Sequence, residues 1–261
     1  MIWIAFQLAG SALLTAAGVR AARKSRRFAT VVVGVMLALI LAKNALSWVP
    51  IGEPRFLPFN WYPLVERWWY LFPAMLIFGV AITLFRASIW RRDALLVGAG
   101  VMILHCTALG WVNSRASDLL GTVGEDGFCA QTSGYSCGAA SAVMLLHRHG
   151  VTATEREMAE LSLTSNGELA GGGTTESGLM RGLRLKLDGN KVPRIDCPTY
   201  DALPAPSIVG LRLSRHLSHS ILVVQVTDTE VKVLDPLYGK GPLCRGEFER
   251  DWLGSAIWIE E

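Results

Sequence analysis

The chain has 261 residues, is 51% hydrophobic and carries a formal net charge of +3, and this length allows one or two domains. Residues 1–116 hold twelve Lys and Arg against three Asp and Glu, whereas residues 117–261 hold thirteen against nineteen. A basic, apolar first half and an acidic second half predict a membrane part followed by an aqueous part. They argue against a nucleic-acid-binding protein, because the second half has no patch of mixed basic and aromatic residues.

Four apolar runs dominate the first half, over residues 2–19, 28–49, 68–85 and 94–112. Each is close to the roughly 20 residues that a helix needs to cross about 30 Å of hydrocarbon. Four such runs within 112 residues favour an all-α transmembrane region over buried core helices. The first run has no basic residues before it, which is untypical of a cleaved signal peptide.

The basic residues of the connecting loops predict an orientation for these helices. The loops after the first and third runs are basic, and the loop between the second and third runs is nearly neutral. The positive-inside rule therefore places both termini, and the domain that follows, outside the cytoplasm of a bacterial inner or plasma membrane. The basic residues concerned are Arg20, Arg23, Lys24, Arg26, Arg27, Arg86, Arg91 and Arg92.

A short polar linker is expected over residues 113–120, followed by a second domain over residues 121–261. Within it, a small polar turn leads into Cys137, and the next twelve residues have a helical pattern that Gly150 closes. Cys137 is thus predicted at a helix N-terminus, where free N–H groups and the helix dipole favour the thiolate. A thiolate is the form that attacks carbonyl groups.

A histidine and an aspartate downstream are candidates to activate this cysteine. His219 opens a predicted strand that runs to residue 226, and a second strand from residue 231 ends at Asp235 and Pro236. Side chains alternate faces along a strand, so the two residues share a face only if the hairpin has an odd-length loop or a bulge. A three-residue loop, residues 227–229, would pair Ile221 with Asp235 and place His219 diagonally beside it.

The spacing of these residues resembles a known enzyme family. Gln131 lies six residues before Cys137, which begins a Cys-Gly-Ala-Ala sequence, and a closing Phe-(x)3-Trp-x-Gly pattern spans residues 248–254. Together with His219 before an apolar strand and the pair Asp235-Pro236, this pattern resembles the double-glycine leader peptidases, cysteine peptidase family thirty-nine. The resemblance covers about residues 121–259 and departs from the family at Ser136, where Asp is usual.

This resemblance implies an α+β, papain-like cysteine peptidase domain that cuts after small residues of a leader-type peptide. In this interpretation Cys137 is the nucleophile, His219 the general base and acid, Asp235 the residue that orients the imidazole, and Gln131 an oxyanion donor. The expected partners are a peptide or protein substrate, the lipid bilayer and a separate exporter or membrane partner. No cofactor, metal or nucleotide is expected, and the chain has no phosphate-binding loop sequence.

Two other functions share the same residues. A peptide-binding module on a membrane scaffold would not need Cys137 to be reactive, and a thiol acyltransferase would use the same triad with an acceptor other than water. Outside the cytoplasm, two of Cys129, Cys197 and Cys244 could also form a disulfide, and their spacing does not decide which pair.

Overall fold

The protein is described here by a computed structural model that divides into two compact units. One unit comprises Met1–Trp48 and Pro63–Val112, and the other comprises Val49–Tyr62 and Asn113–Glu261. The structure describes residues 2–48, 51–56, 62, 71–84, 100, 118–165, 172–187, 189, 191–214 and 217–260.

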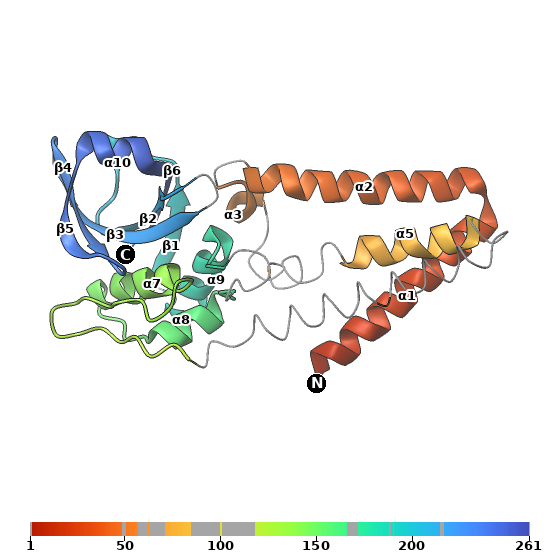
Figure 1. The fold of residues 1–261 in the computed structure, drawn as a ribbon, viewed down its shortest axis with the longest axis horizontal. Coiled ribbons are helices and arrows are strands. Elements are labelled where there is room, and N and C mark those ends of the chain that lie inside the picture. The colour runs from red at the N-terminus through yellow and green to blue at the C-terminus, as the bar shows by residue number, and fades with distance from the viewer. Residues whose placement is uncertain are drawn as a thin grey trace. The chain divides into compact units, whose positions relative to one another are not determined.

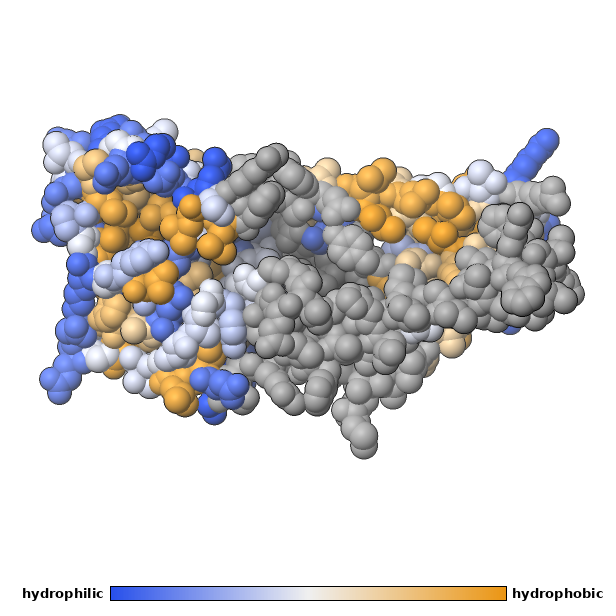
Figure 2. All heavy atoms as spheres, viewed as in Figure 1, coloured by the Kyte–Doolittle hydropathy of each residue, from blue (hydrophilic) through white to orange (hydrophobic). Residues whose placement is uncertain are grey.

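The first unit is helical and contains α1 (Ile2–Lys24), α2 (Arg26–Trp48) and α5 (Leu71–Leu84). Two glycines allow α1 and α5 to pack closely, because a Cβ at Gly18 would lie 2.2 Å from the carbonyl oxygen of Leu76, and one at Gly79 would lie 2.1 Å from that of Thr15. In contrast, α2 exposes many of its apolar side chains, and apolar residues are coloured orange in Figure 2. Those exposed include Phe28, Val31, Val35, Leu37, Leu39 and Leu41.

The predicted four-helix transmembrane region is not supported by these helices. Across the ranges given above, no helix has both the length and the apolar character that crossing a bilayer requires. The first two predicted runs overlap α1 and α2, and the third overlaps α5. The fourth run, residues 94–112, lies almost wholly outside the described residues. The predicted multi-pass membrane localisation, with both termini outside the cytoplasm, therefore has no support from the described helices.

The second unit is built on a six-stranded antiparallel sheet with the order β1-β6-β2-β3-β4-β5. Helices α7, α8 and α9 lie on one side of the sheet in Figure 1, and α10 lies on the other. This arrangement confirms the predicted α+β class. The strands are β1 (Val192–Asp196), β2 (Ser207–Arg212), β3 (Ser218–Val226), β4 (Glu230–Asp235), β5 (Gly239–Cys244) and β6 (Trp252–Glu260); the helices are α3 (Gly52–Phe56), α7 (Cys137–Arg148), α8 (Glu155–Leu161), α9 (Glu176–Lys186), α10 (Arg245–Asp251) and the short 3-10 helix η1 (Tyr200–Ala202).

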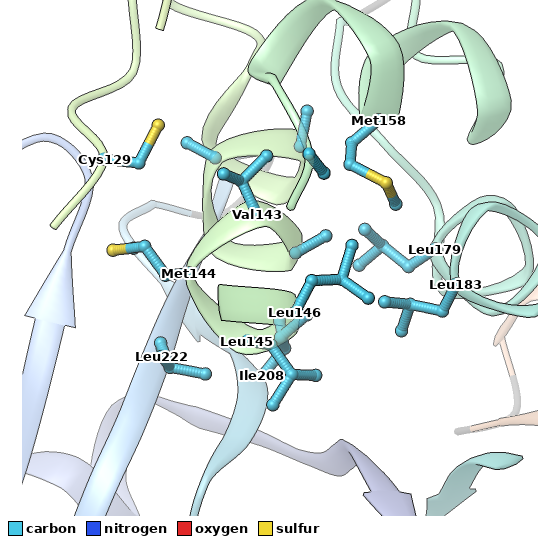
Figure 3. Packing of buried hydrophobic residues seen from close by; sticks show 14 of the residues in the cluster. Cys129, Val143, Met144, Leu145, Leu146, Met158, Leu179, Leu183, Ile208 and Leu222 are labelled. Atoms are coloured by element: carbon cyan, nitrogen blue, oxygen red, sulfur yellow. The ribbon is translucent and has the colours of Figure 1, made fainter. Parts of the chain in front are cut away.

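Helix α7 is the centre of the larger hydrophobic core. Every residue from Gly138 to Leu146 is buried, so this helix is covered on all sides rather than along one stripe. Figure 3 shows its side chains packed against Met158 of α8, Leu179 and Leu183 of α9, and Ile208 and Leu222 of the sheet. A helix held in this way fixes the position of its first residue, Cys137.

Candidate active site

Cys137 is the first residue of α7, as the sequence predicts, and it is partly buried. The hydroxyl of the preceding Ser136 donates to the Ser133 carbonyl at 3.1 Å, so it does not occupy the first N–H groups of the helix. The backbone N–H groups of Gly138 and Ser220 interact with the sulfur of Cys137. The nucleophile candidate therefore lies beside two backbone hydrogen-bond donors, which favour negative charge on the sulfur.

His219 lies on β3 with only 4% of its surface exposed, beside the start of α7. Its Nε2 is 2.7 Å from Oδ1 of Asp235, which leaves Nδ1 as the ring nitrogen available for the hydrogen bond with Cys137. The hydroxyl of Ser141 donates to the Ser220 carbonyl at 3.0 Å and joins α7 to β3 next to His219. The structure thus brings Cys137, His219 and Asp235 into one continuous chain of contacts.

Asp235 ends β4 and is held by a tight turn. Its Oδ1 accepts hydrogen bonds from the backbone N–H groups of Leu237 at 2.8 Å and Tyr238 at 3.0 Å, in addition to the contact with His219. Gly239 completes the turn with a φ of +98°, which a residue with a side chain rarely adopts. The carboxylate is therefore oriented by the backbone before it meets the imidazole.

The β3–β4 hairpin places His219 and Asp235 on the same face by means of a bulge. The three predicted residues, 227–229, do separate the two strands, but next to them Val226 pairs with Val231. That register alone would put the two site residues on opposite faces. A shift between Val223 and Gln225 changes the register so that Leu222 pairs with Leu234, and Ile221 is level with Asp235.

The electrostatics of the three residues favour an ion pair between thiolate and imidazolium. Burial raises the pKa of Cys137, but hydrogen bonding to His219 and to the backbone N–H of Ser220 outweighs it, so the pKa lies below its ordinary value. Burial lowers the pKa of His219, but its hydrogen bonds with Asp235 and Cys137 outweigh this effect and raise the pKa to about 9. For Asp235, burial opposes ionisation, yet the bond from His219 and the two backbone donors leave its pKa lowered. All three net shifts stabilise the charged forms.

Gln131 lies on the loop before α7, next to the Asp235 turn. Its backbone N–H donates to the Pro236 carbonyl at 3.0 Å, and its side-chain Nε2 donates to the Ser133 carbonyl at 2.9 Å. Its Oε1 is buried and meets no hydrogen-bond donor among the described residues. The Nε2 atom carries two N–H bonds, and the Ser133 carbonyl accepts from one of them, so the second N–H can donate to another acceptor.

The other cysteines do not form the disulfide that the sequence allows. Cys129 is buried in the core beside α7, whereas Cys197 and Cys244 are exposed, and all three are free. Burial, with a contribution from the charge of Glu155, raises the pKa of Cys129 to about 12. Cys129 is therefore an unreactive thiol, in contrast to Cys137.

The sequence analysis missed two sets of contacts around the site. The donors from Leu237 and Tyr238 belong to a turn that the sequence Asp-Pro-x-x-Gly could have indicated, because Asp commonly accepts from backbone groups two and three residues ahead. The other set is the buried side chain of Glu155 and its contacts with Thr132. A glutamate at the start of a helix is ordinarily exposed, and the sequence carries no signal of its burial.

Three comparisons relate the second unit to known proteins. A sequence model described as the peptidase C39 family matches residues 126–261. An uncharacterized protein of Methanothermobacter marburgensis is 26% identical over 153 residues, which cover 55% of this chain and 94% of that protein. An uncharacterized protein of Methanothermobacter thermautotrophicus is 28% identical over 144 residues, with coverages of 53% and 92%.

Among solved structures, the chain is similar to the peptidase domain of Streptococcus ComA, a bi-functional ABC transporter involved in a quorum sensing pathway. The TM-score is 0.44 at 21% identity, covering 50% of this chain and 94% of that domain. It is also similar to a double glycine motif protease from an AMS/PCAT transporter in complex with the leader peptide, with a TM-score of 0.44 at 15% identity and coverages of 51% and 89%.

Proposed function

Because the chain belongs to the peptidase C39 family and is a cysteine-type peptidase, we propose that Cys137, His219 and Asp235 are its catalytic triad. The observation that carries this proposal is the chain of contacts from the sulfur through the imidazole to the carboxylate, in which Nε2 and Oδ1 are 2.7 Å apart. The peptidase domain in this proposal comprises residues 121–261, and Gln131 supplies a donor to the oxyanion.

In the first half of the reaction, the Cys137 thiolate attacks the carbonyl carbon of the scissile bond and forms a C–S bond. The carbonyl oxygen becomes an oxyanion, which accepts from the second N–H of Gln131 and from the backbone N–H of Cys137. When the intermediate collapses, His219 gives its Nδ1 proton to the leaving nitrogen, the C–N bond breaks, and the amine leaves. The products of this half are a thioester on Cys137 and a neutral imidazole.

In the second half, water attacks the thioester carbon while Nδ1 of His219 accepts a proton from it. The C–S bond breaks, the peptide acid leaves, and the thiolate and imidazolium are restored. Asp235 keeps its negative charge throughout, holds Nε2 as the protonated nitrogen, and so leaves Nδ1 to exchange the proton. An acyl transfer would follow the same steps with an amine in place of water.

The proposed substrate is a leader-type peptide with small residues before the cut. The proposed partner is a separate exporter that acts on the same peptide. Both are proposed by analogy with double-glycine leader peptidases, and membership of the peptidase C39 family supports the analogy. The backbone near the nucleophile is also crowded: a Cβ at Gly138 would lie 2.9 Å from Cβ of Thr174. Because Gly138 is buried, this close approach packs the start of α7 against the segment that contains Thr174.

The proposal is tested with the full chain and a synthetic peptide that contains a Gly-Gly sequence, with products identified by mass spectrometry. Wild-type protein should release the two fragments after Gly-Gly, and Cys137→Ala should release none. Cys197→Ala is the matched control, because it removes an exposed cysteine outside the site, and it should cleave like wild type. Equal cleavage by wild type and Cys137→Ala would refute the proposed nucleophile. Adding an amine acceptor distinguishes transfer from hydrolysis by the mass of the new product.

A further inference from the structure

Glu155 is a carboxylate that is completely buried, although it is the first residue of α8. The Thr154 hydroxyl caps this helix by accepting from the backbone N–H of Glu157, so the helix start has a cap that does not involve Glu155. The side chain of Glu155 turns away from its own helix toward the segment from residue 120 to residue 132. This segment includes Gln131, the proposed oxyanion donor.

Three hydrogen bonds connect Glu155 to the two ends of this segment. Its Oε1 accepts from the backbone N–H of Thr132 at 2.9 Å. Its Oε2 accepts from the Thr132 hydroxyl at 2.5 Å and from the backbone N–H of Gly121 at 2.9 Å. Both oxygens of the buried carboxylate are therefore satisfied, by two backbone N–H groups and one hydroxyl.

The surrounding chain is shaped to admit this carboxylate. A Cβ on Gly121 would lie 2.6 Å from Oε2 of Glu155, so a residue with a side chain could not approach as closely. The Gly121 carbonyl accepts from the backbone N–H of Glu155 at 2.9 Å, and the Thr132 hydroxyl accepts from the N–H of Leu120 at 3.3 Å. Glu155 thus joins the start of α8 to both ends of the segment.

We propose that Glu155 is a positioning residue for the oxyanion site, acting through Thr132 on Gln131. Gln131 is held from two directions: its own N–H is bound to the Pro236 carbonyl beside Asp235, and its neighbour Thr132 is bound to Glu155. These two attachments fix the backbone from which the Gln131 amide projects. This inference rests on the proposed function, and it concerns stabilisation of the oxyanion rather than activation of Cys137.

The substitution Glu155→Gln tests the role with little change in shape. One carboxylate oxygen becomes an NH2 group, which faces a donor whichever way the amide turns: either the N–H of Thr132 or the N–H of Gly121. Glu157→Gln is the matched control on the same helix, because Glu157 is partly exposed and pairs with Lys186 at 2.7 Å. Thr132→Ala removes the hydroxyl, and with it the 2.5 Å bond to Glu155 and the bond from the N–H of Leu120, but it keeps the backbone N–H that donates to Glu155; Thr132→Ser should restore both lost bonds.

Two reactions of the full chain separate the oxyanion site from the thiolate. Peptide hydrolysis forms an oxyanion, whereas alkylation of Cys137 by iodoacetamide requires only the thiolate. In Glu155→Gln and Thr132→Ala, kcat should fall about 10- to 100-fold, as expected for a slightly misplaced catalytic donor, while KM changes little. The alkylation rate at each pH should stay at the wild-type value, and Glu157→Gln and Thr132→Ser should match wild type in both reactions.

Other outcomes overturn the inference in distinguishable ways. An unchanged kcat in Thr132→Ala would refute it, and so would a fall in alkylation as large as the fall in kcat, because that result describes a general loss of structure. If Glu155→Gln does not fold, the Thr132 pair of variants decides the question. Wild-type protein that is alkylated rapidly but cleaves no peptide would instead overturn the proposed function, and this inference with it.

Discussion

Replacing Asp235 with Asn removes the negative charge from the site while keeping the shape of the turn. The Oδ1 of Asn can still accept from the backbone N–H groups of Leu237 and Tyr238, so the end of β4 should keep its conformation. The bond to His219 becomes a neutral one, and the imidazolium loses its partner. The pKa of His219, which lies at about 9 in the wild type, should therefore fall.

The size of the effect follows from the 2.7 Å contact between Nε2 and Oδ1. A hydrogen bond to a charged group contributes about 1.5–3 kcal/mol, and 1.4 kcal/mol corresponds to a factor of ten. Asp235→Asn should therefore lower the population of the ion pair between thiolate and imidazolium, and the alkylation rate near pH 6, by roughly 10- to 100-fold. The pH at which the alkylation rate increases should move up toward the pKa of an ordinary thiol.

The assay is the rate of iodoacetamide modification at Cys137 against pH, followed by mass spectrometry on the full chain. Asp201→Asn is the control, because Asp201 is 72% exposed and pairs with Arg245 on the surface. Its profile should match the wild type. An Asp235→Asn profile identical to wild type would show that the carboxylate does not support the charge of His219, and would refute the electrostatic argument for the site.

Two further predictions concern stability. Because the pKa of His219 is raised from 6.5 to about 9 in the folded protein, its pairing stabilises fully below pH 6.5 and is lost as pH rises through about 9, whereas the lowered pKa of Cys137 makes stability rise with pH over the same window. The two effects oppose each other in wild type, so the fall of the unfolding midpoint with pH should be larger in Cys137→Ser, which has no thiolate, and should vanish when His219→Ala is added to that variant. Gly138→Ala should reduce the free energy of unfolding by about 1–3 kcal/mol, because its Cβ would lie 2.9 Å from Cβ of Thr174. In denaturant titrations Gly134→Ala, where a Cβ meets nothing within 4 Å, should cost much less, and equal losses in the two variants would contradict the crowding argument.

Patterned and capped elements of the second unit were predictable from the sequence. Helix α7 has a long apolar pattern that ends before Gly150, whose φ is +74°, and this pattern fixed Cys137 as the first residue. The apolar strand after His219 and the alternation before Asp235 gave β3 and β4. These signals are local, so no knowledge of the rest of the fold was required to interpret them.

Two of the strands that the sequence analysis did not predict, β1 and β5, have sequences that are poor strand formers in isolation. β1 contains Pro193, and β5 reads Gly-Lys-Gly-Pro-Leu-Cys. They are the two outer strands of the sheet. Proline, which has no backbone N–H, interrupts no interstrand hydrogen bonds when it faces the side that has no neighbouring strand. Their pairing partners decide that they are strands, and that information is not present in the segments themselves. The apolar runs of the first half were interpreted as membrane spans, which the described helices do not support, because an apolar run indicates burial or lipid contact without distinguishing the two.

The bulge in β3 shows why the site itself was only partly predictable. The sequence identifies Cys137, His219, Asp235 and Gln131 as candidate site residues. It also shows that His219 and Asp235 share a face only if the hairpin has an odd-length loop or a bulge, but it does not decide between the two. The structure uses the bulge between Val223 and Gln225, where Val224 is left without a partner in β4. Val224 instead packs against the core around α7, so burial of this extra side chain offsets the lost pairing. The contact between His219 and Asp235 thus depends on a hydrophobic residue that takes no part in the chemistry. If the intact sequence kept the register of Val226 and Val231 without a bulge, Leu222 rather than Ile221 would be level with Asp235, and His219 would lie on the opposite face.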